Sequence, residues 1–309
     1  MNRLTPTLPA TANVHDDPKS PAAVLWAQAA VLALLVLTVY WAPIQSLLVS
    51  RWLNDGNWSH GWLIPVFSAY FVYSRWGELR RYVVRPTYWG AVVLAGSLAM
   101  NFVFAWVIPM GYPQALSMLG TIFGAVLLVG GWRAAGALWF PIAFLAFAIP
   151  LPQRLYFEMT FPLRAWASTA AAALMPLFID GLHTEAQTVV IDYIAPGGRV
   201  GQLNVEEACS GMRLMMAFVT LGVAMAYLGE RPMWQRAIMV ASCVPIALFC
   251  NTIRVTVTGL LTIHGRTDLA QGTPHQMLGV AMLLLALGLF SAIGYLLSHL
   301  FVEVADQAI

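Results

Sequence analysis

The sequence has 309 residues, of which 60% are hydrophobic and only 10% charged, whereas soluble globular chains have about 45–50% and about 25%. With a mean hydropathy of +0.72, this composition excludes an ordinary soluble enzyme and indicates an integral membrane protein. The net charge is +2 without any basic run, so the chain lacks the electrostatic footprint of a nucleic-acid-binding protein. Its three cysteines fit neither a disulfide scaffold nor a C-x-x-C metal site, and we predict no metal and no cofactor.

Stretches without Asp, Glu, Lys or Arg recur along the chain, and about 20 apolar residues suffice to cross a bilayer. Residues 1–21 are polar, contain both charge signs and predict a disordered cytoplasmic tail. Eight membrane-spanning helices are predicted near 22–48, 58–75, twice within 86–132, 134–150, 210–229, 237–263 and 277–301. We therefore predict one transmembrane domain over 22–301, followed by a cytoplasmic tail at 302–309.

The arginines predict how the chain is oriented. Four lie in the loop at 75–85, one is Arg133, and two lie in the loop at 230–236, whereas the short loops between them hold only Arg51 and Arg266. Because cytoplasmic loops carry the excess of Lys and Arg, both termini are predicted to lie on the cytoplasmic side of the plasma (inner) membrane.

The segment 151–208 must then lie on the outer face, since this orientation needs an even number of crossings within it. Its charge-free part, 165–179, is short for a crossing and predicts an interfacial or re-entrant helix. The β-branched and aromatic run at 188–194, the Pro-Gly-Gly turn at 196–198 and the extended pattern at 200–205 predict a small hairpin. The expected fold class is an all-α polytopic membrane protein with an extracytoplasmic hairpin and an interfacial helix before Cys209.

Arg254 is the charged residue predicted to lie deepest in the membrane. It is about nine residues from the outer end of its helix, which is about 14 Å at about 1.5 Å per residue. Snorkelling to the interface is the alternative to a function, but this distance is more than a side chain comfortably covers. A charge at membrane depth is a functional hypothesis because it is expensive to keep there.

Cys209 lies where the outer polar segment turns into a membrane helix. The positive end of a helix dipole and a nearby cation, Arg213 or Arg254, lower a thiol's pKa towards the reactive thiolate. Glu206 and Glu207 would oppose ionisation at close range, so we expect them to face away, cap the helix or pair with Arg213. The two other cysteines, Cys243 and Cys250, lie within an apolar helix and are interpreted as small buried hydrophobic residues.

His275 opens the last predicted helix on the same outer face. A histidine near an interface is usually a polar anchor, but this topology brings Cys209, Arg254 and His275 to one side of the membrane. A nucleophilic thiol, an oxyanion-stabilising arginine and a histidine acting as general acid or base form a workable acyl-transfer site. The other histidines beyond the N-terminal tail lack such company, and none of their spacings is that of a metal site; they are His60, His183, His264 and His299.

Four elements resemble the exosortase/archaeosortase family of multi-pass membrane cysteine transpeptidases: Glu207-Ala208-Cys209-Ser210-Gly211-Met212-Arg213, Asn251-x-x-Arg254, His275-x-x-x-Gly279 and Ser59-His60-Gly61. The likeness covers about residues 22–301. It implies a catalytic set of Cys209, Arg254 and His275. The residues that it implies to bind substrate or support this set are Glu207, Ser210, Gly211, Arg213, Asn251, Ser59 and His60.

The resemblance also implies partners, namely secreted proteins with a C-terminal PEP-CTERM-type signal of a short motif, a transmembrane helix and a basic cluster. The enzyme would cleave these proteins through a thioacyl-enzyme and pass them to a cell-surface acceptor, which the residues do not identify. Membrane lipid would surround the protein. Two alternatives stay open. One is a transporter or flippase in which Arg254 binds an anionic substrate; the other is an intramembrane protease without acceptor specificity.

Overall fold

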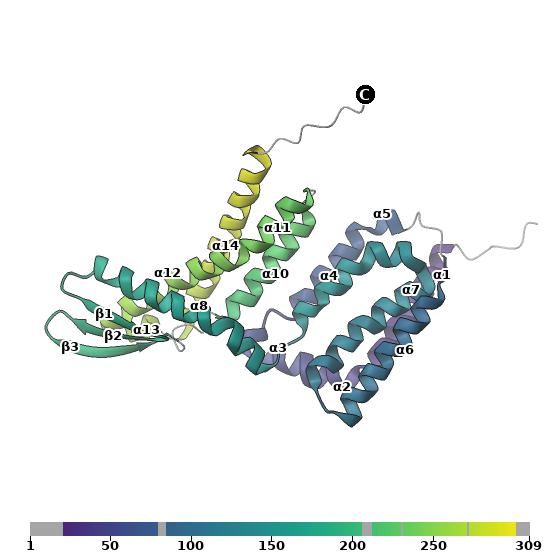
Figure 1. Cartoon of the computed structure of the whole chain (residues 1–309), viewed down its shortest axis with the longest axis horizontal. Helices are drawn as coiled ribbons and strands as arrows, with labels where there is room; N and C mark the ends of the chain where they lie inside the picture. Colours follow the sequence, from purple (N-terminus) through teal and green to yellow (C-terminus); the bar gives the residue numbers. More distant parts are fainter. Residues whose placement is uncertain (1–20, 80–84, 206–211, 230, 271, 301–309) are drawn as a thin grey trace, which may run out of the picture. The chain divides into compact units, whose positions relative to one another are not determined.

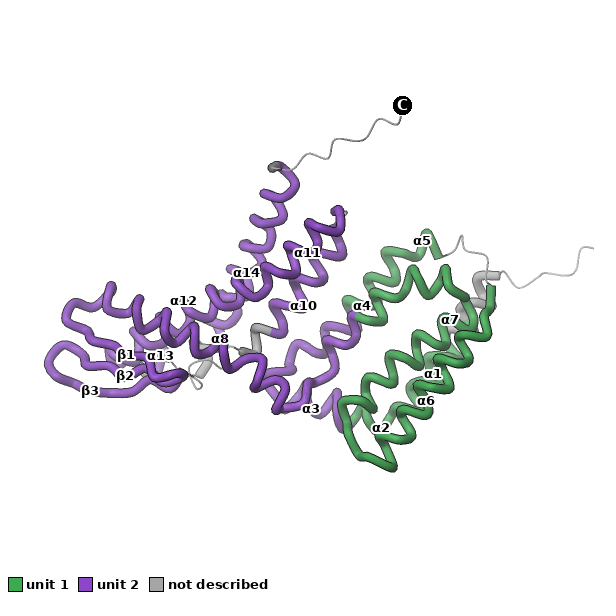
Figure 2. The backbone as a smooth tube through the Cα atoms, viewed as in Figure 1, with its two compact units in different colours: residues 1–45, 67–143 green, residues 46–66, 144–309 purple. Residues whose placement is uncertain are grey.

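The structure is a computed structural model that describes residues 21–79, 85–205, 212–229, 231–270 and 272–300. It is mostly helical, with one small sheet (Figure 1). The chain divides into two compact units, the first Met1–Gln45 with Phe67–Ala143 and the second Ser46–Val66 with Phe144–Ile309 (Figure 2). The predicted tails fall outside the described residues apart from Pro21, and the single domain predicted over 22–301 stays a prediction.

The first unit is built from apolar helices. They are α1 (Pro21–Val39), α2 (Trp41–Pro43), the start of the π-helix η1 (Ile44–Val49), most of α4 (Leu63–Ser74), α5 (Trp76–Leu79), α6 (Tyr88–Phe102), the π-helix η3 (Val103–Val107) and α7 (Gly111–Phe144). The fully buried Tyr40 places its hydroxyl 3.0 Å from Ser117 Oγ and 2.8 Å from Thr121 Oγ1. These hydrogen bonds attach the segment after α1 to α7, since a buried hydroxyl needs a partner.

The α7 helix contains a sharp kink at Gly131, where φ is 74° and ψ is −173°. A β-carbon at this position would lie 2.0 Å from the carbonyl oxygen of Arg85, so only glycine fits both the backbone conformation and the space. The apolar stretch Gly111–Ala148 has 38 residues, about 57 Å if it were one straight helix, against a hydrocarbon core of about 30 Å. The kink lies next to Arg133, which separates the spans that the sequence predicts within 86–132 and at 134–150.

By length and composition, four stretches of the described chain could cross a membrane. They are Tyr88–Val107, Gly111–Ala148, Met233–Ile263 and Met277–His299, with Ala30–Val39 and Trp41–Asn54 making a fifth if this pair, bent by 71°, is one span. Two predicted spans correspond to shorter helices, α4 with 12 residues and the apolar Met216–Leu228. These helices are those of a polytopic membrane protein, and the total of eight spans stays a prediction.

The second unit has α12 (Cys243–Ile263) packed between its other long helices. The remaining elements are α3 (Ser50–Asn54), η2 (Gly56–Trp58), η4 (Leu145–Ala148), α8 (Gln153–Leu174), η5 (Met175–Leu177), α10 (Met212–Leu228), α11 (Met233–Ala241), α13 (Thr267–Ala270) and α14 (Gly272–Leu300). The helices α8, α10, α11 and α14 all pack against α12. Cys243 and Cys250 are 1% and 0% exposed within this core, as the sequence predicts for small buried residues.

The α8 helix replaces the helix predicted at 165–179, and its predicted bounds were wrong. It begins at Gln153, continues through Pro162 and ends at Leu174. The absence of charged residues does not indicate the first half of α8, because that half carries Arg154 and Glu158. These two residues form an i,i+4 ion pair at 2.9 Å. Its location at the membrane interface stays a prediction.

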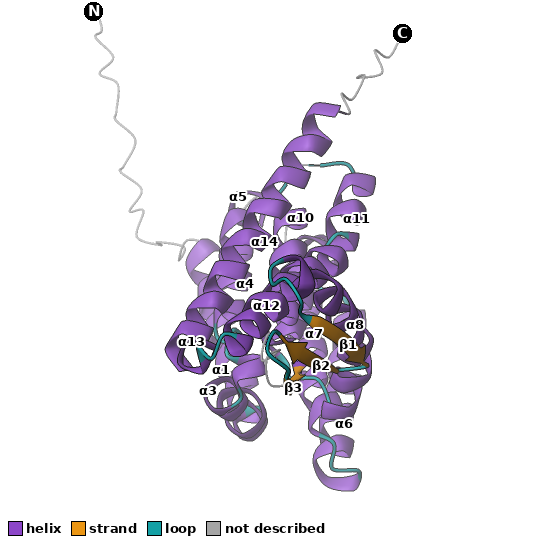
Figure 3. Ribbon diagram, turned by 90° about the vertical axis from the view of Figure 1, so that its left-hand side faces the viewer, coloured by secondary structure: helices purple, strands orange, loops and turns teal. Residues whose placement is uncertain are grey.

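A three-stranded antiparallel sheet stands where a hairpin was predicted (Figure 3). The strands β2 (Val190–Ala195) and β3 (Arg199–Asn204) pair around a turn whose Gly197 and Gly198 have φ of 89° and 78°. The additional strand β1 (His183–Gln187) was missed because its sequence, His-Thr-Glu-Ala-Gln, is polar and has low strand propensity. The sheet packs on α8, and its buried residues share a core cluster with residues of α12.

Candidate functional site

The structure describes only part of the predicted site. Residues 206–211 lie outside the description, and with them the predicted Glu207, Cys209, Ser210 and Gly211. Arg213 lies in the first turn of α10 and His275 in the first turn of α14, but only their backbone is described. The remaining predicted residues are Ser59, His60, Asn251 and Arg254, and all four belong to the second unit.

Arg254 lies in the interior of this unit. It is 4% exposed, on a helix of 21 residues that continues for nine more residues to Ile263. A snorkelling arginine extends along a lipid-facing surface to reach water, whereas this side chain is covered by protein. The snorkelling interpretation therefore does not hold for Arg254.

Polar residues accompany Arg254 on one face of α12. Asn251 is 9% and Thr258 5% exposed, and with Arg254 they recur at i, i+3 and i+7, which places them on the same side of a helix. Next to this face, Gly259 has no side chain, and a β-carbon there would lie 2.7 Å from Met175 Sδ. The glycine thus allows α12 to approach the residues that follow α8 closely. The adjacent face of α12, with Asn251, Arg254 and Thr258, remains polar.

A second buried arginine, Arg164 on α8, was missed by the sequence reasoning. It is 8% exposed, and its guanidinium carbon lies 5.8 Å from the centroid of the Phe157 ring. Thr160, Arg164 and Ser168 recur at i, i+4 and i+8 on the face of α8 that is buried in the unit. This periodic polar stripe is the signal in the sequence that marks the buried face, whereas the charge-free stretch at 165–179 begins one residue after Arg164.

Two hydroxyls in this region are buried without a hydrogen-bond partner among the described residues. They are Ser168 Oγ on α8 and Thr258 Oγ1 on α12. A buried polar atom is normally paired, and exceptions are a feature of functional sites or of sites that hold water. The buried faces of α8 and α12 therefore carry polar as well as apolar side chains.

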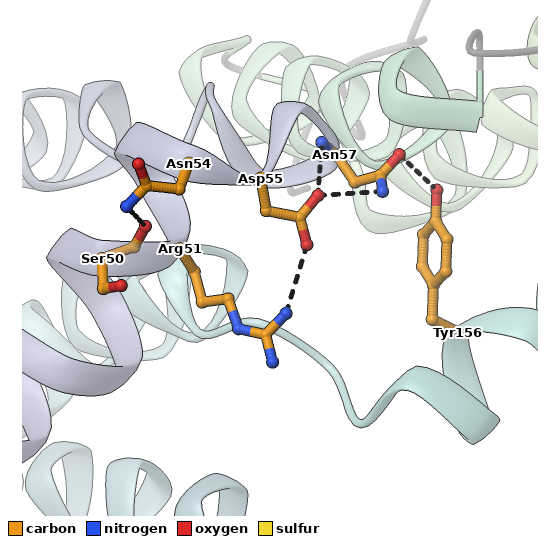
Figure 4. Close-up of polar contacts among 6 residues, drawn as sticks. All are labelled: Ser50, Arg51, Asn54, Asp55, Asn57 and Tyr156. Carbon is orange, nitrogen blue, oxygen red and sulfur yellow. Dashed lines mark hydrogen bonds and ion pairs between the residues drawn. The ribbon is translucent and has the colours of Figure 1, made fainter.

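The predicted Ser59-His60-Gly61 element follows a loop held by polar contacts (Figure 4). The carboxylate of Asp55 accepts hydrogen bonds from Asn57 N at 3.0 Å and Asn57 Nδ2 at 2.9 Å, and Arg51 Nη1 lies 3.4 Å from its other oxygen. Tyr156 Oη on α8 donates to Asn57 Oδ1 at 3.4 Å. These contacts fix the loop before Ser59 and connect it to α8.

Gly61 is required by the aromatic side chain that covers it. Trp52 Nε1 donates to the carbonyl oxygen of Ala148 at 2.8 Å, and a β-carbon on residue 61 would lie 2.2 Å from that same nitrogen. Only glycine leaves room for the indole and its hydrogen bond. Ser59 is exposed, and its Oγ donates to the carbonyl oxygen of Gly56 at 3.0 Å, which stabilises the turn.

His60 is held against the core of the unit. Its ring stacks on Trp58 with centroids 6.0 Å apart and an interplanar angle of 30°, and Trp58 is 4% exposed. Burial lowers the pKa of His60 from 6.5 to about 4, so the imidazole is neutral near pH 7. Its Nε2 is buried and has no hydrogen-bond partner in the described part of the chain. The sequence predicts no catalytic role for His60. In the structure, however, η2, the turn just before His60, packs against α10.

The second unit thus combines elements that are distant in sequence. The loop with His60, the polar face of α12 and the first turns of α10 and α14 all belong to it, and α10, α12 and α14 pack against one another. Buried guanidinium donors in such surroundings can bind an anion or stabilise a developing oxyanion. Among the described residues, no group of three His, Cys, Asp or Glu side chains could hold a metal ion.

Comparison with protein families assigns most of the chain to a known family. The model of a family described as transmembrane exosortase matches residues 52–292, which run from Trp52 in α3 into α14. No curated protein and no solved structure matches the chain. Because the match covers more than half of the sequence, the chain belongs to the transmembrane exosortase family, a family of membrane-embedded, multi-pass cysteine transpeptidases.

Proposed function

We propose that this protein is a membrane-embedded cysteine transpeptidase that cleaves the C-terminal, PEP-CTERM-like sorting signal of secreted proteins and transfers them to a cell-surface acceptor. The observation that carries the proposal is the buried Arg254 on α12, in the unit whose described helices also include the first turn of α14 with His275. Family membership supports the processing of a sorting signal.

The reaction is an acyl transfer in two halves. The Cys209 thiolate attacks the scissile carbonyl carbon, a carbon–sulfur bond forms, and the carbonyl oxygen becomes an oxyanion that Arg254 stabilises. The carbon–nitrogen bond then breaks, and His275 donates a proton to the leaving amine. An acceptor amine, another nucleophile or water then attacks the thioester carbonyl carbon and gives its proton to the now neutral His275. The carbon–sulfur bond breaks and releases the thiolate.

The burial of Arg254 supports its role as oxyanion stabiliser. A donor that is already desolvated and held by its helix interacts more strongly with developing charge than one in water, and it needs no reorganisation during the reaction. Asn251, one turn earlier on the same face, is an uncharged donor that supports the same site. Within this proposal, Glu207, Ser210, Gly211, Arg213 and Ser59 support the nucleophile or contact substrate.

The arginine distribution supports a location in the plasma (inner) membrane with both termini cytoplasmic and the active site on the extracytoplasmic face. The substrate's transmembrane helix then inserts beside the last three spans, and its motif reaches the outer surface. Reporter fusions after Gly181 and Gly201 test this orientation and are expected to read as external. An internal signal at both sites contradicts it.

A transporter or flippase is the second candidate, because a buried Arg254 also suits an anion-binding site in a membrane. Mass spectrometry of a secreted substrate after incubation with the purified protein in vesicles separates the candidates. We expect a new C-terminus that carries the mass of an acceptor. A new C-terminus with a free carboxyl identifies a protease without acceptor specificity, and an intact substrate contradicts the proposed function.

A further inference from the structure

The resemblance implies that His60 binds substrate or supports the catalytic set, but neither the proposed reaction nor the fold gives its imidazole a specific contact. The fold requires the glycine at position 61 and the tryptophan at position 58, which pack against Trp52 and in the core. The imidazole stacks on Trp58, a contact that a phenyl ring would make equally well. What a phenyl ring lacks is Nε2, the atom that is buried here without a partner in the described chain.

The unpartnered nitrogen is held in a fixed place. On one side, Asp55 and Asn57 order the turn before His60, and Tyr156 attaches that turn to α8. On the other side, Gly61 lies directly under Trp52. A group that is oriented before the ligand arrives loses little conformational entropy on binding. A buried nitrogen left without a hydrogen bond is destabilising, and binding of a matching ligand group recovers that loss.

The character of the imidazole restricts the ligand. Because burial keeps His60 neutral near pH 7, its Nε2 is an uncharged hydrogen-bonding atom and has no Coulomb attraction for a carboxylate or phosphate. An imidazole that is protonated only near pH 4 is also a weak base at neutral pH, so it does not duplicate the role given to His275. The matching ligand group is uncharged and polar, and an extended peptide presents such groups in its backbone amides.

We infer that His60 binds substrate, with its Nε2 forming a hydrogen bond to a backbone peptide group of the sorting signal beside α10. This inference rests on the proposed function, because it needs a peptide substrate at the site. It adds a binding contact from the N-terminal part of the chain to a catalytic set drawn from the C-terminal part.

Three substitutions test which atom matters. A glutamine side chain can place its amide near the position of Nε2, an asparagine places its amide near that of Nδ1, and a phenylalanine keeps only the stacking. We expect His60→Phe and His60→Asn to raise the KM for a sorting-signal substrate in vesicles about tenfold, the loss of one hydrogen bond, with kcat little changed. His60→Gln is expected to stay within about threefold of the original KM.

The matched control is His264→Phe, which changes an exposed histidine at the end of α12 in the same unit. It is expected to leave KM and kcat unchanged. A normal KM for His60→Phe, rescue by asparagine as good as by glutamine, or an equal loss in all three variants overturns the inference. Cleavage by the unaltered protein in the same vesicles shows separately whether the proposed function holds.

Discussion

Replacing Gly61 by alanine tests whether the packing of Trp52 positions the His60 loop. The new β-carbon would lie 2.2 Å from Trp52 Nε1 and 2.3 Å from Cδ1 of the same ring, so the indole must move. If it moves, the hydrogen bond from Nε1 to the carbonyl oxygen of Ala148, now 2.8 Å long, is lost. The substitution therefore acts on the contact between α3 and η4 as well as on its own loop.

The expected destabilisation has two parts. Overpacking costs about 1–3 kcal/mol, and loss of the indole hydrogen bond costs about 1 kcal/mol. Their sum, about 2–4 kcal/mol, is large compared with the effect of most surface substitutions. It is measured as the change in free energy of unfolding of the purified protein in detergent micelles, and cleavage of a sorting-signal substrate is measured on the same samples.

Gly288→Ala is the matched control, since this exposed glycine of α14 has no heavy atom within 4 Å of the added β-carbon. It should leave stability unchanged or raise it by up to about 1 kcal/mol through helix propensity. The double variant Trp52→Leu with Gly61→Ala removes the clash, so its loss should be smaller than the sum of the single losses. Normal stability of Gly61→Ala, or strict additivity in the double variant, refutes the reasoning.

Three further predictions concern buried ionisable side chains. Arg164→Gln should lower stability and processing strongly because it alters the polar interior beside α12, whereas Arg154→Gln, whose side chain is 91% exposed, should change neither; thermal unfolding and substrate cleavage measure both. Burial lowers the pKa of His60 to about 4, so the unfolded chain binds a proton at a higher pH than the folded chain does. The free energy of unfolding should therefore fall by up to about 3 kcal/mol as the pH drops from about 6.5 to about 4. A His60→Gln variant should lack this component, and an unchanged pH dependence contradicts the assignment. Arg254→Ala should abolish processing and Arg254→Lys should reduce it severely, since lysine keeps the charge without the planar set of donors; near-normal cleavage by well-folded Arg254→Ala removes it from the mechanism.

The sequence predicts well those elements whose signal is local composition. The helices at Tyr88–Val107 and Met277–His299 follow directly from long apolar stretches, because lipid contact requires apolar side chains over the whole length of a span. The burial of Cys243 and Cys250 follows in the same way. A cysteine inside an apolar helix is expected to be buried as a small hydrophobic residue.

Other features depend on contacts that composition does not encode. The β1 strand is polar and forms because β2 offers it hydrogen bonds, and α8 extends across charged residues because its buried face packs on α12. Arg164 was missed because its burial arises from that packing. Likewise, the His60 loop lies about 150 residues before α10, and such a distant contact follows from topology rather than from residue type.

Substrate cleavage by Cys209→Ala in vesicles tests whether Cys209 is the nucleophile. We expect an intact, membrane-inserted variant that accumulates uncleaved substrate. The double variant Cys243→Ala with Cys250→Ala, which changes two buried cysteines of α12, should process substrate normally after correction for its folded fraction. Continued cleavage by Cys209→Ala contradicts the cysteine transpeptidase and leaves the transporter as the better description.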